Sequence, residues 1–193
     1  MSETTTTAPA VRTVNGIELP AAGTWTIDVS HSSVNFKVKH LGLAKTRGRF
    51  SDFEGTVEIG EHPRDTTVSV SIDAASVDPH DEKRDGHLLS PDFFDVENHP
   101  KLSFRSTSVD GRDDQWAVEG ELTVAGVTRP VVLDVTYEGV AGDPWGGTRA
   151  GFTASAQVNR EDFGLSWNAA LETGGFLVGK TVTIDLDIEL VRS

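Results

Sequence analysis

Hydrophobic and polar residues alternate along most of the chain from Thr24 onward. The clearest example is the last stretch, where Val182, Ile184 and Leu186 alternate with polar residues such as Thr183 and Asp185. An alternation with a period of two is typical of a β-strand that buries one face. Similar stretches begin near residues 25, 34, 57, 68, 102, 116, 131 and 152. The sequence therefore predicts an all-β chain of about eight strands.

These strands are expected to be antiparallel. Parallel sheets that are covered on both faces give continuous apolar runs, whereas one apolar and one polar face is typical of antiparallel sheets. Turn-forming pairs such as Asp110-Gly111 and Ala125-Gly126 separate the stretches. Long antiparallel strands must close or stack to cover their edges. A closed up-and-down barrel and a two-sheet sandwich are the alternatives.

Two features favour the barrel. Several strands run for about ten residues, which is long for a sandwich. Their inward face also mixes large residues with small ones, including Gly120, Ala154 and Ala156. In an eight-stranded barrel, small inward residues leave room for one ligand, or they simply fit the taper of the barrel. We therefore expect an extended eight-stranded antiparallel up-and-down barrel.

Two segments interrupt the strand pattern and predict short helical excursions. The first runs from about residue 81 to 94 and combines acids, Arg84, His87 and several large apolar side chains. The second covers residues 159–165. There Asn159 can cap a helix, the acids that follow it favour the first turn, and Gly164 ends it.

The domain boundaries follow from the same pattern. Residues 1–22 predict a flexible N-terminal extension, with a short strand near residues 14–19, and residues 23–193 form the barrel domain. The N-terminus lacks the basic start and apolar core of a secretory signal, so we expect a cytoplasmic protein. The apolar runs are shorter than the roughly 20 residues that a membrane-spanning helix needs.

Charge and composition exclude several classes of function. The formal net charge is −13, which would repel a nucleic-acid backbone. The chain has no cysteine, so it has no disulfide and no thiolate chemistry. No pair among the six histidines has the spacing of a helical zinc site, and no nucleophile elbow or phosphate loop occurs. The sequence therefore predicts no catalytic residue, no metal ligand, no cofactor and no enzymatic activity.

Two groups of polar residues are candidates for ligand contact. His40 continues the inward frame of Phe36 and Val38, so it is either a hydrogen-bonded core histidine or a polar contact in a cavity. Arg84 suits a diphosphate or carbonyl head group if the first excursion lies at the barrel mouth. Apolar neighbours such as Phe94 would then face the barrel opening, or would only plug its end.

Taken together, these segments resemble the YceI-like family of polyisoprenoid-binding, lipocalin-like bacterial proteins. The strongest match is the run from Arg84 to Asp95, and the others include residues 25–28, 120–131 and 160–164. They occur in the family's order and at its spacings over most of residues 24–190.

The resemblance implies a lipocalin-like barrel whose long apolar interior holds a polyisoprenoid, an isoprenoid quinone or a similar long-chain amphiphile. It also implies transport or storage without catalysis, often in homodimers, and many relatives carry an export leader. We expect head-group contacts from His40, Arg84, Asp85 and His87, and tail contacts from Phe36, Val38, Phe94, Phe104, Leu122 and Phe152.

Two other functions are compatible with the sequence. The chain could be an accessory enzyme acting on a bound quinone or isoprenoid, with His40 or His87 as a proton shuttle. It could also be a filled barrel with a structural or interaction role.

Overall fold

A computed structural model describes residues 10–78, 82–144, 146–172 and 174–193, with the backbone alone for residues 82–85. In chain order the strands are β1 (Val11–Val14), β2 (Ile17–Pro20), β3 (Gly23–Ile27), β4 (Ser33–His40), β5 (Ala44–Phe50), β6 (Phe53–Ile59), β7 (Thr67–Asp73), β8 (Val77–Asp78), β9 (Lys101–Arg112), β10 (Gln115–Val124), β11 (Val127–Gly142), β12 (Thr148–Asn159) and β13 (Val178–Arg192). The helical elements are α1 (Glu82–Leu89) and the 3-10 turns η1 (Val29–His31), η2 (Pro63–Asp65), η3 (Ala74–Ser76) and η4 (Arg160–Phe163).

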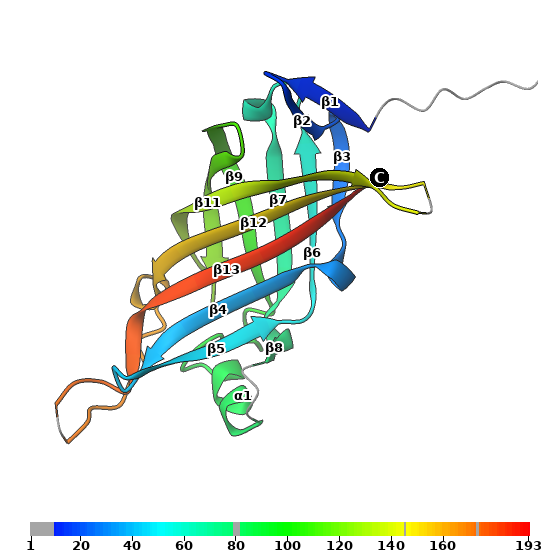
Figure 1. Ribbon diagram of the computed structural model, residues 1–193. Coiled ribbons are helices and arrows are strands. Elements are labelled where there is room, and N and C mark those ends of the chain that lie inside the picture. Colours follow the sequence, from blue (N-terminus) through cyan, green and yellow to red (C-terminus); the bar gives the residue numbers. More distant parts are fainter. Residues whose placement is uncertain (1–9, 79–81, 145, 173) are drawn as a thin grey trace, which may run out of the picture.

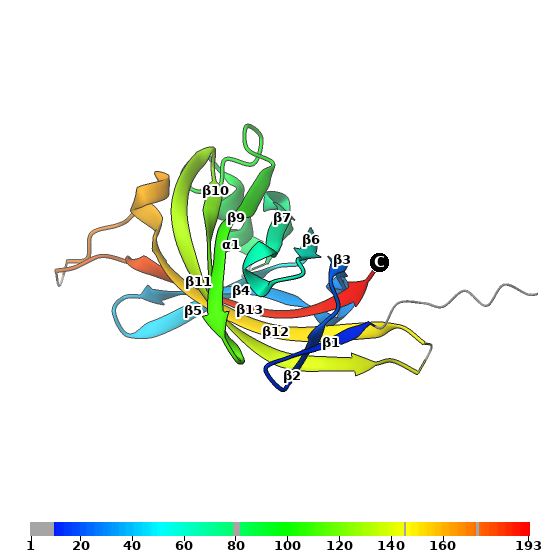
Figure 2. The ribbon, with the colours of Figure 1, turned by 90° about the horizontal axis from the view of Figure 1, so that it is seen from above.

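The strands close into one antiparallel barrel (Figures 1 and 2). Neighbouring strands follow the order β12-β11-β10-β9-β7-β6-β3-β13, and β13 pairs in turn with β12, which completes the ring. The predicted eight-stranded antiparallel barrel is therefore confirmed. Closure leaves none of these eight strands as an open edge.

Parts of the barrel wall consist of strands that bend. β3 and β4 both pair with β13 and are separated by η1, while β7 and β8 are separated by η3. An aspartate begins each of these turns: the Asp28 side chain accepts a hydrogen bond from the Ser30 backbone N–H, and Asp73 accepts one from Ala75. Such caps satisfy backbone donors while the chain leaves the strand conformation.

A hairpin covers one end of the barrel (Figure 1). β1 and β2 are joined by Asn15 and Gly16, which both have positive φ, as a tight hairpin turn requires. Leu19 is buried, and the Tyr137 hydroxyl donates a hydrogen bond to the Glu18 carbonyl at 2.7 Å. The extension was expected to hold one short strand; the structure places two paired strands at residues 11–20, and residues 1–9 lie outside its description.

The two predicted helical excursions both form. α1 lies at the end of the barrel opposite the hairpin (Figure 1). In η4, the Asn159 side chain accepts a hydrogen bond from the Glu161 N–H, and Gly164 ends the turn in the left-handed region at φ 81°. Among the described residues, no helix has the length and apolar character needed to cross a bilayer.

Candidate functional site

The barrel encloses a long apolar cavity. Its volume is about 780 Å³, and its lining is drawn from strands all around the wall, from Leu19 at the hairpin end to Leu88 in α1. Cavities of roughly 300–1,000 Å³ are typical of small-molecule sites. The interior is therefore hollow, which argues against a barrel filled by its own side chains.

Glycines in the wall allow two aromatic rings to lie against it and so leave the centre of the lumen open. A Cβ atom at Gly48 would lie 2.4 Å from Cζ of Phe36, and one at Gly120 would lie 2.4 Å from Cζ of Phe104. Each ring therefore lies over the backbone of the neighbouring strand, in space that any larger residue would occupy. The small residues of the inward face thus widen the lumen by giving the rings a place against the wall.

The six residues predicted to contact a ligand tail all line this cavity: Phe36, Val38, Phe94, Phe104, Leu122 and Phe152. They are spread along its length. Under the hairpin, the ring centroids of Phe152 and Tyr137 lie 5.3 Å apart. Near α1, the ring centroids of Phe94 and Phe50 lie 5.6 Å apart. The period-two pattern placed five of these side chains on the lumen side of the wall, whereas Phe94 was expected to face the barrel opening from the first excursion. The contact of all six with a ligand stays a prediction.

The predicted head-group residues that the structure describes lie at the α1 end. His40 and His87 line the cavity, and both are partly exposed. His40 is partly exposed, and within the described part of the chain its imidazole has no hydrogen-bond partner, so its contact with a ligand stays a prediction. The side chains of Arg84 and Asp85 lie outside the described residues, and their predicted contacts are not placed.

His87 also fastens α1 to the barrel. Its Nε2 lies 3.0 Å from Oδ2 of Asp92, and its ring meets the rings of Trp167 and Phe93 edge-on, with centroids 4.5 and 5.0 Å apart. The imidazole therefore borders the cavity and holds the helix to the loop after η4 at the same time. Trp167, which also lines the cavity, was not among the predicted site residues.

Arg160 is the main site residue that sequence reasoning missed. It is 4% exposed, lines the cavity, and donates hydrogen bonds to the carbonyls of Gly179 at 2.9 Å and Trp167 at 2.9 Å, and to that of Leu165. Burial lowers the pKa of its guanidinium, which the nearby Glu161 charge partly offsets. The alternation along β12 could have identified it, because Arg160 continues the inward-facing series of Ala154, Ala156 and Val158. His40 continues the inward-facing series of β4 in the same way.

These polar groups converge on one end of the cavity. Arg160 bonds to the Trp167 carbonyl, the Trp167 ring contacts His87, and His40 pairs across the sheet with Val178, another lining residue. The rest of the lumen is lined mainly by apolar side chains. The cavity thus has a polar cluster at the α1 end and a long apolar body, and Arg12 and Tyr137 add polar atoms to its lining at the hairpin end. This combination suits an amphiphile.

A group of potential metal ligands lies elsewhere, near the end of β13. Ligand atoms of Asp28, His31 and Glu189 lie within 4.8 Å of one another. However, the Arg149 guanidinium bonds to both carboxylates, at 2.6 Å to Asp28 and closely to Glu189. The pKa of Asp28 lies well below its usual range because of hydrogen bonds from Ser30, Arg149 and His31. Arg149 supplies the positive charge here, so we assign no metal.

Comparison with known proteins identifies the family. The chain matches the family model described as "YceI-like domain" over residues 25–190. Protein YceI of Escherichia coli O157:H7 is 42% identical over 136 residues, which cover 70% of this chain and 71% of that protein. The crystal structure of Burkholderia cenocepacia BcnA superposes with a TM-score of 0.72 at 23% identity, covering 84% of this chain and 98% of that one.

A second solved structure, a polyisoprenoid binding domain from Saccharophagus degradans, superposes with a TM-score of 0.69 at 17% identity, covering 88% of this chain and 98% of that one. These likenesses show the same fold. Because the family model spans most of the barrel and its bounds fall within β3 and β13, this chain belongs to the YceI-like family.

Proposed function

We propose that this protein binds a polyisoprenoid, an isoprenoid quinone or a similar long-chain amphiphile inside its barrel, for transport or storage. The observation that carries the proposal is the cavity of about 780 Å³ with a long apolar body and a cluster of polar groups at the α1 end. Each methylene buried there contributes about 0.8 kcal/mol by transfer from water. The fold shared with the Saccharophagus degradans domain, which is named for polyisoprenoid binding, supports the assignment.

In this proposal the head group lies at the α1 end. His40 offers a polar atom without a protein partner among the described residues, and Arg160 places a buried positive charge beside the same end. A carbonyl or anionic head group would accept hydrogen bonds from such donors. The tail would extend toward the β1–β2 hairpin along Phe104, Leu122 and Phe152. Binding involves no catalytic step.

Native mass spectrometry of the protein purified from cells, followed by organic extraction, tests this function. We expect a bound species whose extracted mass corresponds to a long-chain isoprenoid or a related amphiphile. A protein that releases no lipid and takes up neither a long-chain quinone nor a polyprenol would contradict the proposal.

A pair of neighbouring substitutions tests whether the lumen is the site. Ala154 lines the cavity, whereas Ser155 is exposed on the outer face of the same strand. A tryptophan at position 154 would occupy ligand space, so we expect Ala154→Trp to weaken lipid binding about tenfold or more, since about 1.4 kcal/mol is tenfold. Ser155→Trp is the matched control and should bind as the parent does. Equal binding by both variants would place the ligand elsewhere.

A further inference from the structure

Three exposed apolar side chains lie together at one end of the barrel. Leu43 is 89% exposed and Leu41 41% in the β4–β5 turn, and Phe176 is 59% exposed in the loop before β13. The two segments are joined, because the Leu41 N–H donates a hydrogen bond to the Leu177 carbonyl at 2.9 Å. We call Leu41, Leu43 and Phe176 the apolar tip. Large apolar side chains exposed side by side are typical of an interaction site.

Positive charge surrounds the apolar tip. Residues 29–51 contain no acid, although the whole chain has a net charge of −13. Lys39, Lys45 and Arg47 are exposed, and none of them has an ion pair among the described residues. Their neighbours are neutralised, since Lys37 pairs with Asp185 at 2.7 Å and Arg49 with Asp78 at 3.0 Å. Glu172 is the acid on the adjoining loop, so the basic groups outnumber it.

The arrangement of these basic residues is unfavourable for the fold itself. Lys39 and Lys45 are direct cross-strand partners, so two positive charges face each other on the outer surface. Like charges in this position destabilise a sheet. An anionic partner outside the chain would relieve this repulsion.

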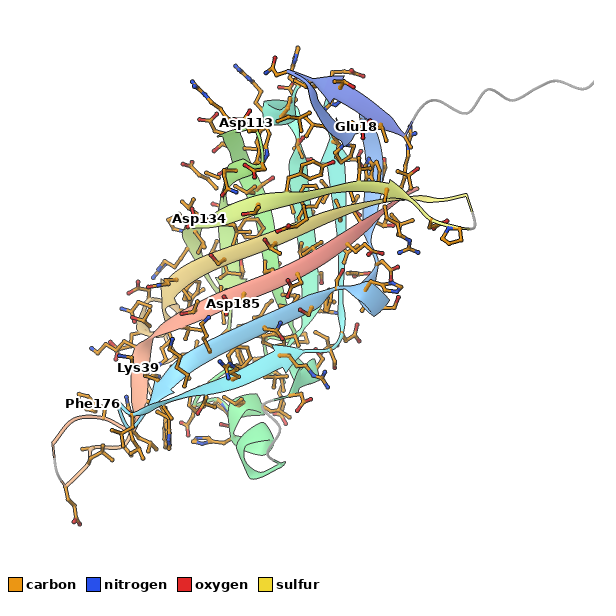
Figure 3. The ribbon with its side chains drawn as sticks, in the orientation of Figure 1. Glu18, Lys39, Asp113, Asp134, Phe176 and Asp185 are labelled. Carbon is orange, nitrogen blue, oxygen red and sulfur yellow. The ribbon has the colours of Figure 1, made fainter. Side chains whose placement is uncertain are left out.

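The apolar tip lies where the cavity reaches the surface. Lys39 is exposed and also lines the cavity, together with His40 and Leu177. Figure 3 shows Lys39 and Phe176 at one end of the molecule, with Glu18 and Asp113 at the other. The polar end of the lumen, the apolar tip and the unpaired basic residues thus share one end.

We propose that this end docks on the surface of an anionic lipid bilayer. Leu43 and Phe176 enter the boundary between head groups and acyl chains, while Lys39, Lys45 and Arg47 lie over the lipid phosphates. A second copy of the chain is a poorer partner, because two such ends would bring like charges together. The inference goes beyond lipid binding in the lumen, since it names the surface at which the barrel meets a membrane.

Co-sedimentation with vesicles tests the docking. We expect the full chain to sediment with vesicles of phosphatidylcholine mixed with phosphatidylglycerol, much less with phosphatidylcholine alone, and less as salt is added. Lys45→Glu should weaken binding at least about fivefold, the effect expected for one basic residue at an anionic surface. This variant also relieves the repulsion with Lys39, so its fold should be at least as stable as the parent's.

Matched controls separate the docking surface from general effects. Arg112→Glu makes the same charge change at the exposed last residue of β9, beside Asp113 at the opposite end, and should bind vesicles almost as the parent does. Leu43→Ser should weaken binding several-fold, whereas Val132→Ser, which removes another exposed apolar side chain, should not.

Two outcomes would overturn the proposal. The first is equal sedimentation with neutral and anionic vesicles, or equal loss in Lys45→Glu and Arg112→Glu. The second is a dimer that Leu43→Ser dissociates, without vesicle binding, which would assign the apolar tip to a second copy. The assay needs no cargo in the lumen, so its failure leaves the proposed lipid binding standing, and the reverse also holds.

Discussion

Tyr137, the single tyrosine of the chain, lies beneath the β1–β2 hairpin. It is 7% exposed, and its hydroxyl donates to the Glu18 carbonyl. Burial raises the pKa of Tyr137 to about 12, and the negative charge of Glu18 adds to the shift. Since no other tyrosine absorbs, this residue reports directly on how well the hairpin covers the barrel end.

The raised pKa of Tyr137 predicts a loss of stability in alkaline solution. The neutral phenol is favoured in the folded state, so its contribution is complete below the unfolded pKa of 10.0 and is lost as the pH rises toward about 12. A shift of this size corresponds to about 3 kcal/mol of unfolding free energy. Urea unfolding at neutral and alkaline pH should show this decrease in the parent and not in Tyr137→Phe. A tyrosinate absorbance change centred near 10 in the folded protein would contradict it.

At the scale of single residues, the alternation of inward-facing and outward-facing positions predicted most of the residues that line the lumen. It missed Arg160, at the end of β12. Phe36, Phe104 and Phe152 were placed by alternation alone. Arg160 obeys the same alternation, but Asn159 and Gly164 favoured a helical reading of that segment, and both readings are correct. The arginine directly follows the last residue of β12, continues its inward phase and is the first residue of η4. A sequence pattern assigns each segment either the period of a strand or that of a helix. A residue at the junction between a strand and a helical turn is therefore easily missed.

Among the elements, η4 and the loop before β13 depend on one side chain. The Arg160 guanidinium bonds to the carbonyls of Leu165, Trp167 and Gly179, which lie on both arms of the loop. Those carbonyls are partly or fully buried, so removal of the donor leaves them without a partner at a cost of about 1–3 kcal/mol for each unsatisfied group.

We therefore expect Arg160→Met to lower the unfolding free energy by about 2–4 kcal/mol, given that several buried hydrogen bonds are lost while the volume is kept. Equilibrium unfolding in urea measures the change. Arg112→Met, at the exposed last residue of β9, is the control and should change stability by less than about 0.5 kcal/mol. A stability for Arg160→Met equal to that of the control would show that the loop is held by other contacts.

The bends in the wall could not be read from the strand pattern. The alternation of Trp25 and Ile27 continues to Val29, which suggests one strand, yet Val29 lies in η1 and is 41% exposed. The turn begins because the Asp28 side chain binds the Ser30 backbone N–H. A single capping hydrogen bond thus decides where the strand ends, and hydrophobic spacing carries no information about it.

For the molecule as a whole, the alternation predicted the barrel because every strand must bury its apolar face and closure removes the edges. The open lumen was not predictable in the same way. Whether Phe36 and Phe104 fill the interior depends on their rings lying over Gly48 and Gly120, which belong to neighbouring strands. Cross-strand relationships of this kind depend on register, and register emerges only in the folded sheet.

The pairing around the wall is very uneven. Among the described residues, β12 and β13 pair over eleven residues, whereas β5 and β8 pair at Arg49 with Asp78 and at Phe50 with Val77. Regions with few backbone hydrogen bonds open locally at a lower free energy than long ladders. In hydrogen exchange read by mass spectrometry, peptides covering residues 49–50 and 77–78 should exchange well before those covering β12 and β13. Uniform protection around the wall would contradict this.

The short β5–β8 junction affects how the barrel can open. A closed barrel is usually taken as a rigid tube, which a long chain can enter only by threading from one end. Among the described residues, β5 and β8 pair at two positions beside α1 and β3 and β13 pair at three, whereas the other ladders of the wall are longer. Thermal motion should part the β5–β8 junction before the long ladders, and this would open a lateral route into the lumen beside α1.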